Sequence, residues 1–306
     1  MARKLTEGRI SSLADVLGSR QLYSGGWAYF GSGQESIEVT CLAALALGRE
    51  AQANYSAAIS FLLKSQLKDG SWPAFLGDSE GNWTTALAVC AMNATGDLPA
   101  VREKAVRWLD REQGREGHWL WRWKFKTVDR SVRFNPDKYG WPWSPEAASW
   151  VIPTALSIVA LKQFTSCNRS EASEQRIQLG VEMLLDRACV GGGWNAGNSV
   201  VHGVPLKPHV EATAIALLAL QDEPRSRVIR AGIDWLHMRS ASIRSAESLA
   251  WCILSLFVFQ EPVERLKEDL IMTLGESGAI ENTATLAAAI LALKCGEMIH
   301  PFVVLR

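Results

Sequence analysis

Six short apolar runs, spread over almost the whole 306-residue chain, constrain its fold more than any other feature. Each spans about three helical turns and is small and apolar on nearly every side. A helix that is apolar all round is buried all round, and six such helices cannot all lie at the surface. The pattern therefore predicts an inner layer of helices starting near residues 36, 83, 152, 211, 247 and 281. The runs cover residues 36–47, 82–92, 150–161, 209–220, 245–256 and 279–293.

Amphipathic stretches alternate with these runs, and their charges recur on one face, as expected for helices with one solvent-facing side. They cover residues 54–66, 101–113, 177–188, 226–240 and 263–274. Alternation of outer and inner helices, six times over, predicts two concentric rings. A linear solenoid of helix pairs is the competing arrangement.

A second repeated signature, Gln-x3-Gly-x-Trp, follows several of the outer segments. Glycine can adopt the left-handed conformation that ends a helix, glutamine can bond unpaired backbone groups there, and tryptophan can pack over the turn. We therefore expect each of these tryptophans to cover the turn into an inner helix. The matched sets are Gln21, Gly25 and Trp27; Gln66, Gly70 and Trp72; Gln113, Gly117 and Trp119; and Ala188, Gly192 and Trp194, which lacks only the glutamine.

These segments resemble the QW motif of squalene-hopene and oxidosqualene cyclases, and the apolar runs resemble the prenyltransferase/squalene-oxidase repeat in general. The resemblance covers about residues 20–295. It implies an all-α fold, an α/α toroid of two concentric rings of about six helices each, an α6/α6 barrel. It does not by itself establish function, because one fold hosts many activities.

One toroid accounts for the whole chain, so we expect a single domain over residues 1–306. An aromatic-rich insert at about residues 120–149 interrupts the repeats and is expected to lie across one mouth of the ring. Long loops in compact domains are often functional.

Carboxyl groups recur two residues before the shared threonine position of the inner runs. Four copies have Glu there, and the other two have Trp83 and Ile152; the four are Glu38, Glu211, Glu247 and Glu281. Acidic residues in a first helical turn complement the helix dipole, which is the structural interpretation. The functional interpretation is that a carboxyl group in an apolar pocket has a raised pKa and can donate a proton.

The family resemblance points to one of these residues. In squalene-hopene cyclases the acid lies in an Asp-x-Asp-Asp-Thr motif, with the middle Asp as proton donor. This chain has no such motif, and its nearest match is His209-Val210-Glu211-Ala212-Thr213. The resemblance thus implies Glu211 as the candidate catalytic acid and His209 as a residue that orients it, while the last carboxylate of the motif is missing.

Tryptophan is unusually frequent, at 13 residues against 4 tyrosines. Aromatic faces near a cavity mouth could hold an isoprenoid and stabilise carbocations, or could simply fill loop turns. We expect a substrate-binding set made of Glu38, Trp83, Trp143, Trp150, Trp194 and Glu281.

Equal numbers of basic and acidic residues, 32 each, give no indication of nucleic-acid binding. No signal-peptide core, no long apolar span and no CxxC pair among six cysteines favour a cytoplasmic protein. No metal site and no cofactor motif is expected. Peripheral membrane contact and a protein partner both stay open. The leading hypothesis is a class II terpene-cyclase-like protein that binds an apolar, isoprenoid-like small molecule and cyclises it by metal-free acid chemistry; the alternative is a non-catalytic toroid that binds a protein or lipid.

Overall fold

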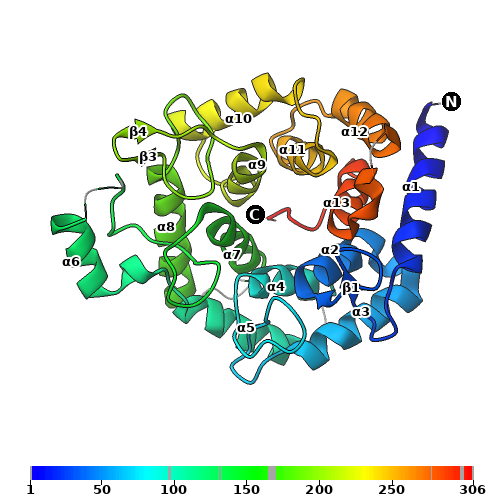
Figure 1. The fold of residues 1–306 in the computed structure, drawn as a ribbon, viewed down its shortest axis with the longest axis horizontal. Helices are drawn as coiled ribbons and strands as arrows, with labels where there is room; N and C mark the ends of the chain where they lie inside the picture. The colour runs from blue at the N-terminus through cyan, green and yellow to red at the C-terminus, as the bar shows by residue number, and fades with distance from the viewer. Residues whose placement is uncertain are drawn as a thin grey trace.

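The structure, a computed structural model, describes residues 2–95, 98–129, 131, 133–164, 170–276, 278–296 and 300–304. Within them the chain forms an α/α toroid, with an inner and an outer ring of helices (Figure 1). The inner ring contains α2 (Ile37–Leu47), α4 (Thr84–Thr95), α7 (Val151–Phe164), α9 (Val210–Ala219), α11 (Ala246–Val258) and α13 (Thr283–Leu293). The outer ring contains α1 (Ala2–Ser19), α3 (Gln52–Ser65), α5 (Pro99–Arg111), α8 (Glu171–Asp186), α10 (Arg227–Ser240) and α12 (Glu264–Glu276).

The inner helices begin within two residues of the expected positions and are buried on nearly every side, because their sequences are apolar all round. Short elements occupy the connections between the helices. They are the 3₁₀ turns η1 (Gly48–Ala51), η2 (Arg115–Gly117) and η3 (Gly278–Glu281), and the antiparallel pairs β1–β2 (Trp27–Ala28 with Glu35–Ser36) and β3–β4 (Val200–Val201 with Val204–Pro205).

The ring is closed, which excludes the linear solenoid. Each inner helix packs against the next, and the last, α13, packs against the first, α2. Across this seam the Lys294 ammonium donates to the Ala46 carbonyl at 3.1 Å, and the Thr283 amide donates to the Tyr29 carbonyl at 2.8 Å. The outer helix α1 also packs against the inner helix α13, so it covers the seam from outside.

One hydrogen-bond pattern explains the repeated tryptophan and threonine. In four repeats the tryptophan amide donates to the threonine hydroxyl of the next inner helix, at 2.9 or 3.0 Å. The indole nitrogen donates to a leucine carbonyl near the end of the preceding outer helix, so each ring joins the two layers. The four pairs are Trp27 with Thr40, Trp72 with Thr85, Trp141 with Thr154, and Trp194 with Thr213.

The third repeat corrects a sequence prediction, because Trp141 takes the place expected for Trp119. Trp119 is 70% exposed, whereas Trp141 is 1% exposed and bonds to Leu109 and Thr154 in the repeat pattern. The indole reaches a carbonyl 10 residues back in the other three copies and 32 residues back here. The insert therefore splits the motif, and the chain returns to it at Gly140-Trp141.

We expected the insert to lie across a mouth of the ring, but only its last part reaches the mouth, where Trp143 packs against Trp83. Its helix α6 (Trp119–Thr127) lies outside the ring, beyond α8 (Figure 1). It is held by a buried ion pair in which the Arg187 guanidinium donates to the Glu116 carboxylate at 2.8 Å. The same carboxylate accepts the Ser149 amide, so the loop after the insert is fixed as well.

The C-terminal segment enters the middle of the ring (Figure 1). Gln163 and Gln221, at the C-terminal ends of α7 and α9, donate to the carbonyls of Pro301, Val303 and Phe302. The Phe302 ring is fully buried with its centroid 5.4 Å from that of Trp251 on α11. The segment therefore fills the end of the barrel where the inner helices terminate.

No helix in the described ranges is long and apolar enough to span a bilayer. Five of the six cysteines are free and buried; Cys167 lies outside the described residues.

Candidate functional site

Three of the expected carboxyl groups meet at the mouth formed by the N-terminal ends of the inner helices. Glu38, Glu211 and Glu247 each lie in the first turn of their helix, two residues after the cap residue. α11 packs against α9 and α13, and α13 packs against α2, so one sector of the ring carries all three. All three are half-buried, so solvent and ligands can reach them.

Hydroxyl groups hold each carboxylate in place. The Tyr29 hydroxyl donates to Glu38, the Ser248 hydroxyl donates to Glu211 at 2.6 Å, and the Thr285 hydroxyl donates to Glu247 at 3.4 Å. Each hydroxyl comes from a different part of the chain from the carboxyl group it serves. Ser248 and Thr285 were not identified from the sequence, because a single hydroxyl in a helix start carries no distinctive pattern.

The electrostatics of this group, which we call the mouth carboxyl cluster (Glu38, Glu211 and Glu247), favour a retained proton. Burial raises the pKa of Glu38; the Tyr29 hydrogen bond opposes this, and the charge of Glu247 adds to it. Burial also raises the pKa of Glu247, and the charge of Glu211 adds to that shift while the Thr285 bond opposes it. The pKa of Glu38 and that of Glu247 are therefore both raised, mainly by burial.

Glu281 does not join the cluster. α13 begins at Thr283 with Asn282 as its cap, so the residue equivalent to Glu247 in that helix is Ala284. Glu281 lies in η3 and is exposed, and its backbone carbonyl accepts a bond from Arg20. The sixth repeat was assigned three residues too early, because Thr283 mimics the shared threonine of the other copies.

His209 is the cap residue of α9, yet its side chain makes no capping bond and is exposed. It stands two residues from Glu211, and no hydrogen bond links the two side chains in the structure. The geometry therefore gives His209 no orienting contact with the expected acid.

The expected aromatic set divides into two kinds. Trp83 and Trp143 are half-buried and form an edge-to-face pair, with ring centroids 4.9 Å apart, at the start of α4. Trp150 is 37% exposed and packs beside Gly197. Trp194 is completely buried and bonded to Leu184 and Thr213, so it has no surface for a ligand, which corrects its assignment to the substrate-binding set.

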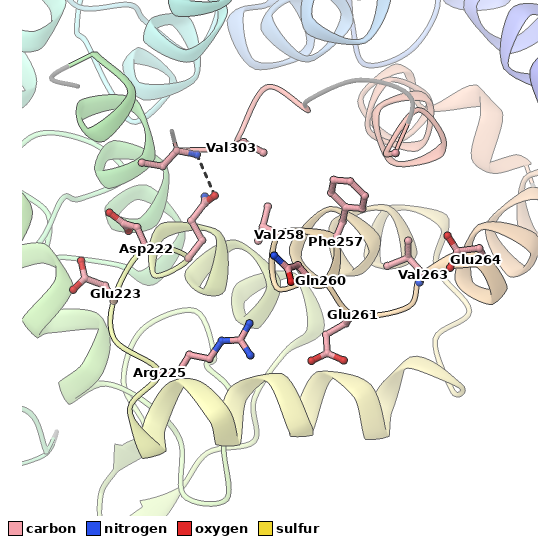
Figure 2. Close-up of a pocket in the computed structure, with 13 residues that line it drawn as sticks. Asp222, Glu223, Arg225, Phe257, Val258, Gln260, Glu261, Val263, Glu264 and Val303 are labelled. Carbon is pink, nitrogen blue, oxygen red and sulfur yellow. Dashed lines mark hydrogen bonds between the residues drawn. The ribbon is translucent and has the colours of Figure 1, made fainter. Parts of the chain in front are cut away.

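A second candidate site is an open depression of about 980 Å³ at the opposite end of the barrel (Figure 2). Its charged side chains already have partners: Lys162 holds Asp222 and Glu223, and His237 holds Glu261. Val303 and Val304 of the C-terminal segment line it too. Paired charges are poor proton donors, so the mouth carboxyl cluster is the stronger candidate. Among the described residues, no group of three His, Cys, Asp or Glu side chains is arranged to hold a metal ion.

No protein-family model matches the sequence, and no curated protein matches it. Solved structures match its fold. A protein from Actinoplanes is 14% identical, with 96% of this chain and 100% of that chain covered and a TM-score of 0.60. An inactive variant of an α-1,6-mannanase from Salegentibacter is 7% identical, with coverage of 94% and 98% and a TM-score of 0.64.

A variant of the type II terpene cyclase MstE from Scytonema, solved with its substrate geranylgeranyl dihydroxybenzoate, is 15% identical. Here 95% of this chain and 79% of that chain are covered, with a TM-score of 0.55. At these identities the similarity establishes the α/α toroid and leaves the activity open, since the fold serves both a glycosidase and a terpene cyclase.

Proposed function

We propose that the protein binds an apolar, isoprenoid-like molecule at the mouth of the toroid and protonates it with a carboxyl group of the mouth carboxyl cluster. One observation supports the proposal: burial raises the pKa of both Glu38 and Glu247 at this mouth, and the charge of Glu247 raises that of Glu38 further. A carboxylic acid that stays neutral near neutral pH is what protonation of an alkene requires.

Glu38 is the member we propose as proton donor. It is held by Tyr29, and burial is the largest influence on its pKa. Glu247 has the supporting role in this proposal, because its charge raises the pKa of Glu38. Glu211, expected from the sequence to be the acid, acts one step further away, since its charge raises the pKa of Glu247. The aromatic pair Trp83 and Trp143 would cover the hydrocarbon part of the ligand.

The test is an activity screen with linear polyprenes, with and without an aromatic head group, followed by analysis of cyclised products. Glu38→Gln keeps the size of the side chain and removes the transferable proton. It should lower turnover about a hundredfold or more, as expected for loss of a general acid, while ligand binding is kept. Glu247→Gln should leave activity but move its pH profile to lower pH, because the charge that raises the pKa of Glu38 is lost.

Glu281→Gln is the matched control, since Glu281 is exposed and outside the cluster. It should match the wild-type protein in both binding and turnover. Full activity in Glu38→Gln would contradict the assignment of the acid. Cleavage of oligosaccharides in place of isoprenoid turnover would replace it with glycoside hydrolysis, which also uses neighbouring carboxyl groups.

A non-catalytic binding toroid is the second candidate. It is favoured by the filling of the barrel by Phe302 and Trp251, which leaves the ligand a site at the mouth instead of a deep chamber. In that case wild-type protein and Glu38→Gln would bind the same ligands, and neither would convert them.

A further inference from the structure

Helix α6 displays an apolar stripe that no part of the toroid covers. Trp119 is 70% exposed, Trp123 is 56% exposed and Leu120 is 48% exposed. At 100° per residue these three side chains fall on adjacent positions of one helix face. Val128, at the end of the helix, adds a further exposed apolar side chain, 66% accessible. Exposed aromatic rings in such a group are unusual for a surface that meets only water.

The opposite face of α6 is the one that attaches to the protein. Trp121 and Phe125 are half-buried, with ring centroids 6.1 Å apart, and Phe125 contacts Phe134 edge-on at 5.3 Å. The Arg115 guanidinium also lies 4.6 Å from the centre of the Trp121 ring. The inner aromatic residues therefore account for the packing of the helix. Of the outer ones, Trp119 contacts only the His118 ring among the described aromatic residues, with centroids 5.8 Å apart, and both tryptophans stay exposed.

Cationic side chains flank the stripe. Lys124 and Lys126 lie on either side of it by helical position, both exposed. The Lys126 ammonium is paired with Asp137 at 2.6 Å, and the Lys124 ammonium lies 4.6 Å from the centre of the Trp121 ring. The segment from Arg115 to Lys138, which contains α6, has seven Lys or Arg against three Asp or Glu, in a chain with no net charge.

We propose that this face of α6 is an interfacial anchor that binds the surface of an anionic phospholipid bilayer. Tryptophan prefers the boundary between headgroups and acyl chains, and flanking lysines gain from anionic lipid. The charge complementarity selects an anionic surface. The position of α6 outside the ring lets it reach a flat surface without moving the toroid (Figure 1). The buried Glu116–Arg187 pair at the base of the insert transmits the attachment to the ring.

Co-sedimentation with vesicles tests the anchor. The full chain should bind vesicles of phosphatidylcholine mixed with phosphatidylglycerol, and bind vesicles of phosphatidylcholine alone much less. Trp119→Ser combined with Trp123→Ser should weaken binding to the mixed vesicles by at least about tenfold, because the inserting side chains are lost. Lys124→Gln should weaken it by about fivefold, the effect of one cation at an anionic surface.

The matched control combines Met238→Ser and Met272→Ser, which remove exposed apolar side chains of similar accessibility, 72% and 56%, from outer helices α10 and α12. It should bind like the wild-type protein. Circular dichroism should show equal helicity in all variants, since none of the changed side chains is buried. Binding that is unchanged by the tryptophan substitutions would overturn the proposal. So would a lipid-free dimer that these substitutions dissociate, because the stripe would then be covered by a second copy.

Discussion

At the scale of single residues, Trp119 and Trp141 exchange the roles that their sequence context suggests. Trp119 completes a Gln-x3-Gly-x-Trp match yet is exposed, whereas Trp141 has no such match and is buried in the repeat pattern. Local sequence cannot tell which Gly-x-Trp the chain will use when an insert separates the parts of a motif. The choice depends on Thr154 and Leu109, which bond Trp141 from helices distant in sequence.

The exchange predicts that two similar substitutions have very different effects on the free energy of unfolding. Trp141→Ala should reduce the free energy of unfolding by about 3–5 kcal/mol, because it leaves a large cavity and the buried Leu109 carbonyl without its indole partner. Trp119→Ala should change it by less than about 0.5 kcal/mol, as for an exposed position. Denaturant unfolding of the two variants measures both values. Comparable losses in the two would show that the repeat pattern at Trp141 contributes little.

The carboxyl cluster was predictable in part. The spacing identified Glu38, Glu211 and Glu247, because a repeated position in a closed ring returns to the same mouth. The spacing could not rank the three residues as proton donors. Glu211 was singled out only because its neighbours in sequence resemble the acid motif of the cyclases. The pKa of Glu38 depends on burial and on Glu247, which comes from a different helix.

At the scale of elements, the turns that end the outer helices depend on glycine for two separate reasons. Gly192 has a φ of +104°, and a Cβ there would lie 2.2 Å from the Ala231 carbonyl oxygen of the next outer helix. Gly191 has a φ of +90° but nothing within 4 Å of a Cβ. Gly192 therefore permits both the left-handed backbone conformation and the close approach of the turn to α10. Gly191 permits only the conformation.

This pair allows the two contributions to be separated. Gly191→Ala should cost about 1–2 kcal/mol of stability from the left-handed conformation. Gly192→Ala should cost at least about 1 kcal/mol more, because the methyl group also displaces α10. Thermal and denaturant unfolding provide the comparison. If the two variants were equally stable, the close approach of the turn to α10 would not be a constraint on the fold.

Element boundaries followed well from the sequence where apolar runs are continuous, and less well where a cap decides. The inner helices from α2 to α11 begin within two residues of the start of their apolar runs. The start of α13 instead depends on Asn282, whose side chain accepts the Thr285 amide at 3.1 Å. Its apolar run begins earlier and obscures this cap. The insert helix α6 was not expected, because its aromatic and basic residues do not follow the pattern of the repeats.

At the scale of the whole molecule, the two ends of the barrel differ in kind. The C-terminal segment fills one end, where Asp222 and Glu223 of the neighbouring depression are ion-paired with Lys162. The other end displays three carboxyl groups, each held by a hydroxyl of its own, and the charge of Glu211 raises the pKa of Glu247. The repeat pattern does not predict this difference between the two ends, because the segment after the last repeat has no counterpart elsewhere in the chain. The central claim is that burial at the open mouth lets Glu38 keep its proton above the pH at which ordinary Glu side chains ionise.

Isotope-edited infrared spectroscopy of protein labelled with ¹³C-glutamate tests this claim most directly. The wild-type protein should keep a protonated carboxyl band at a pH above that at which ordinary Glu side chains ionise, because burial raises the pKa of Glu38. Glu38→Gln should remove that part of the band. Glu112→Gln is the matched control: burial raises the pKa of Glu112 as well, but it lies outside the cluster, so the Glu38 band should remain. A wild-type band that vanishes at the ordinary pH for glutamate, or one unchanged in Glu38→Gln, would contradict the account.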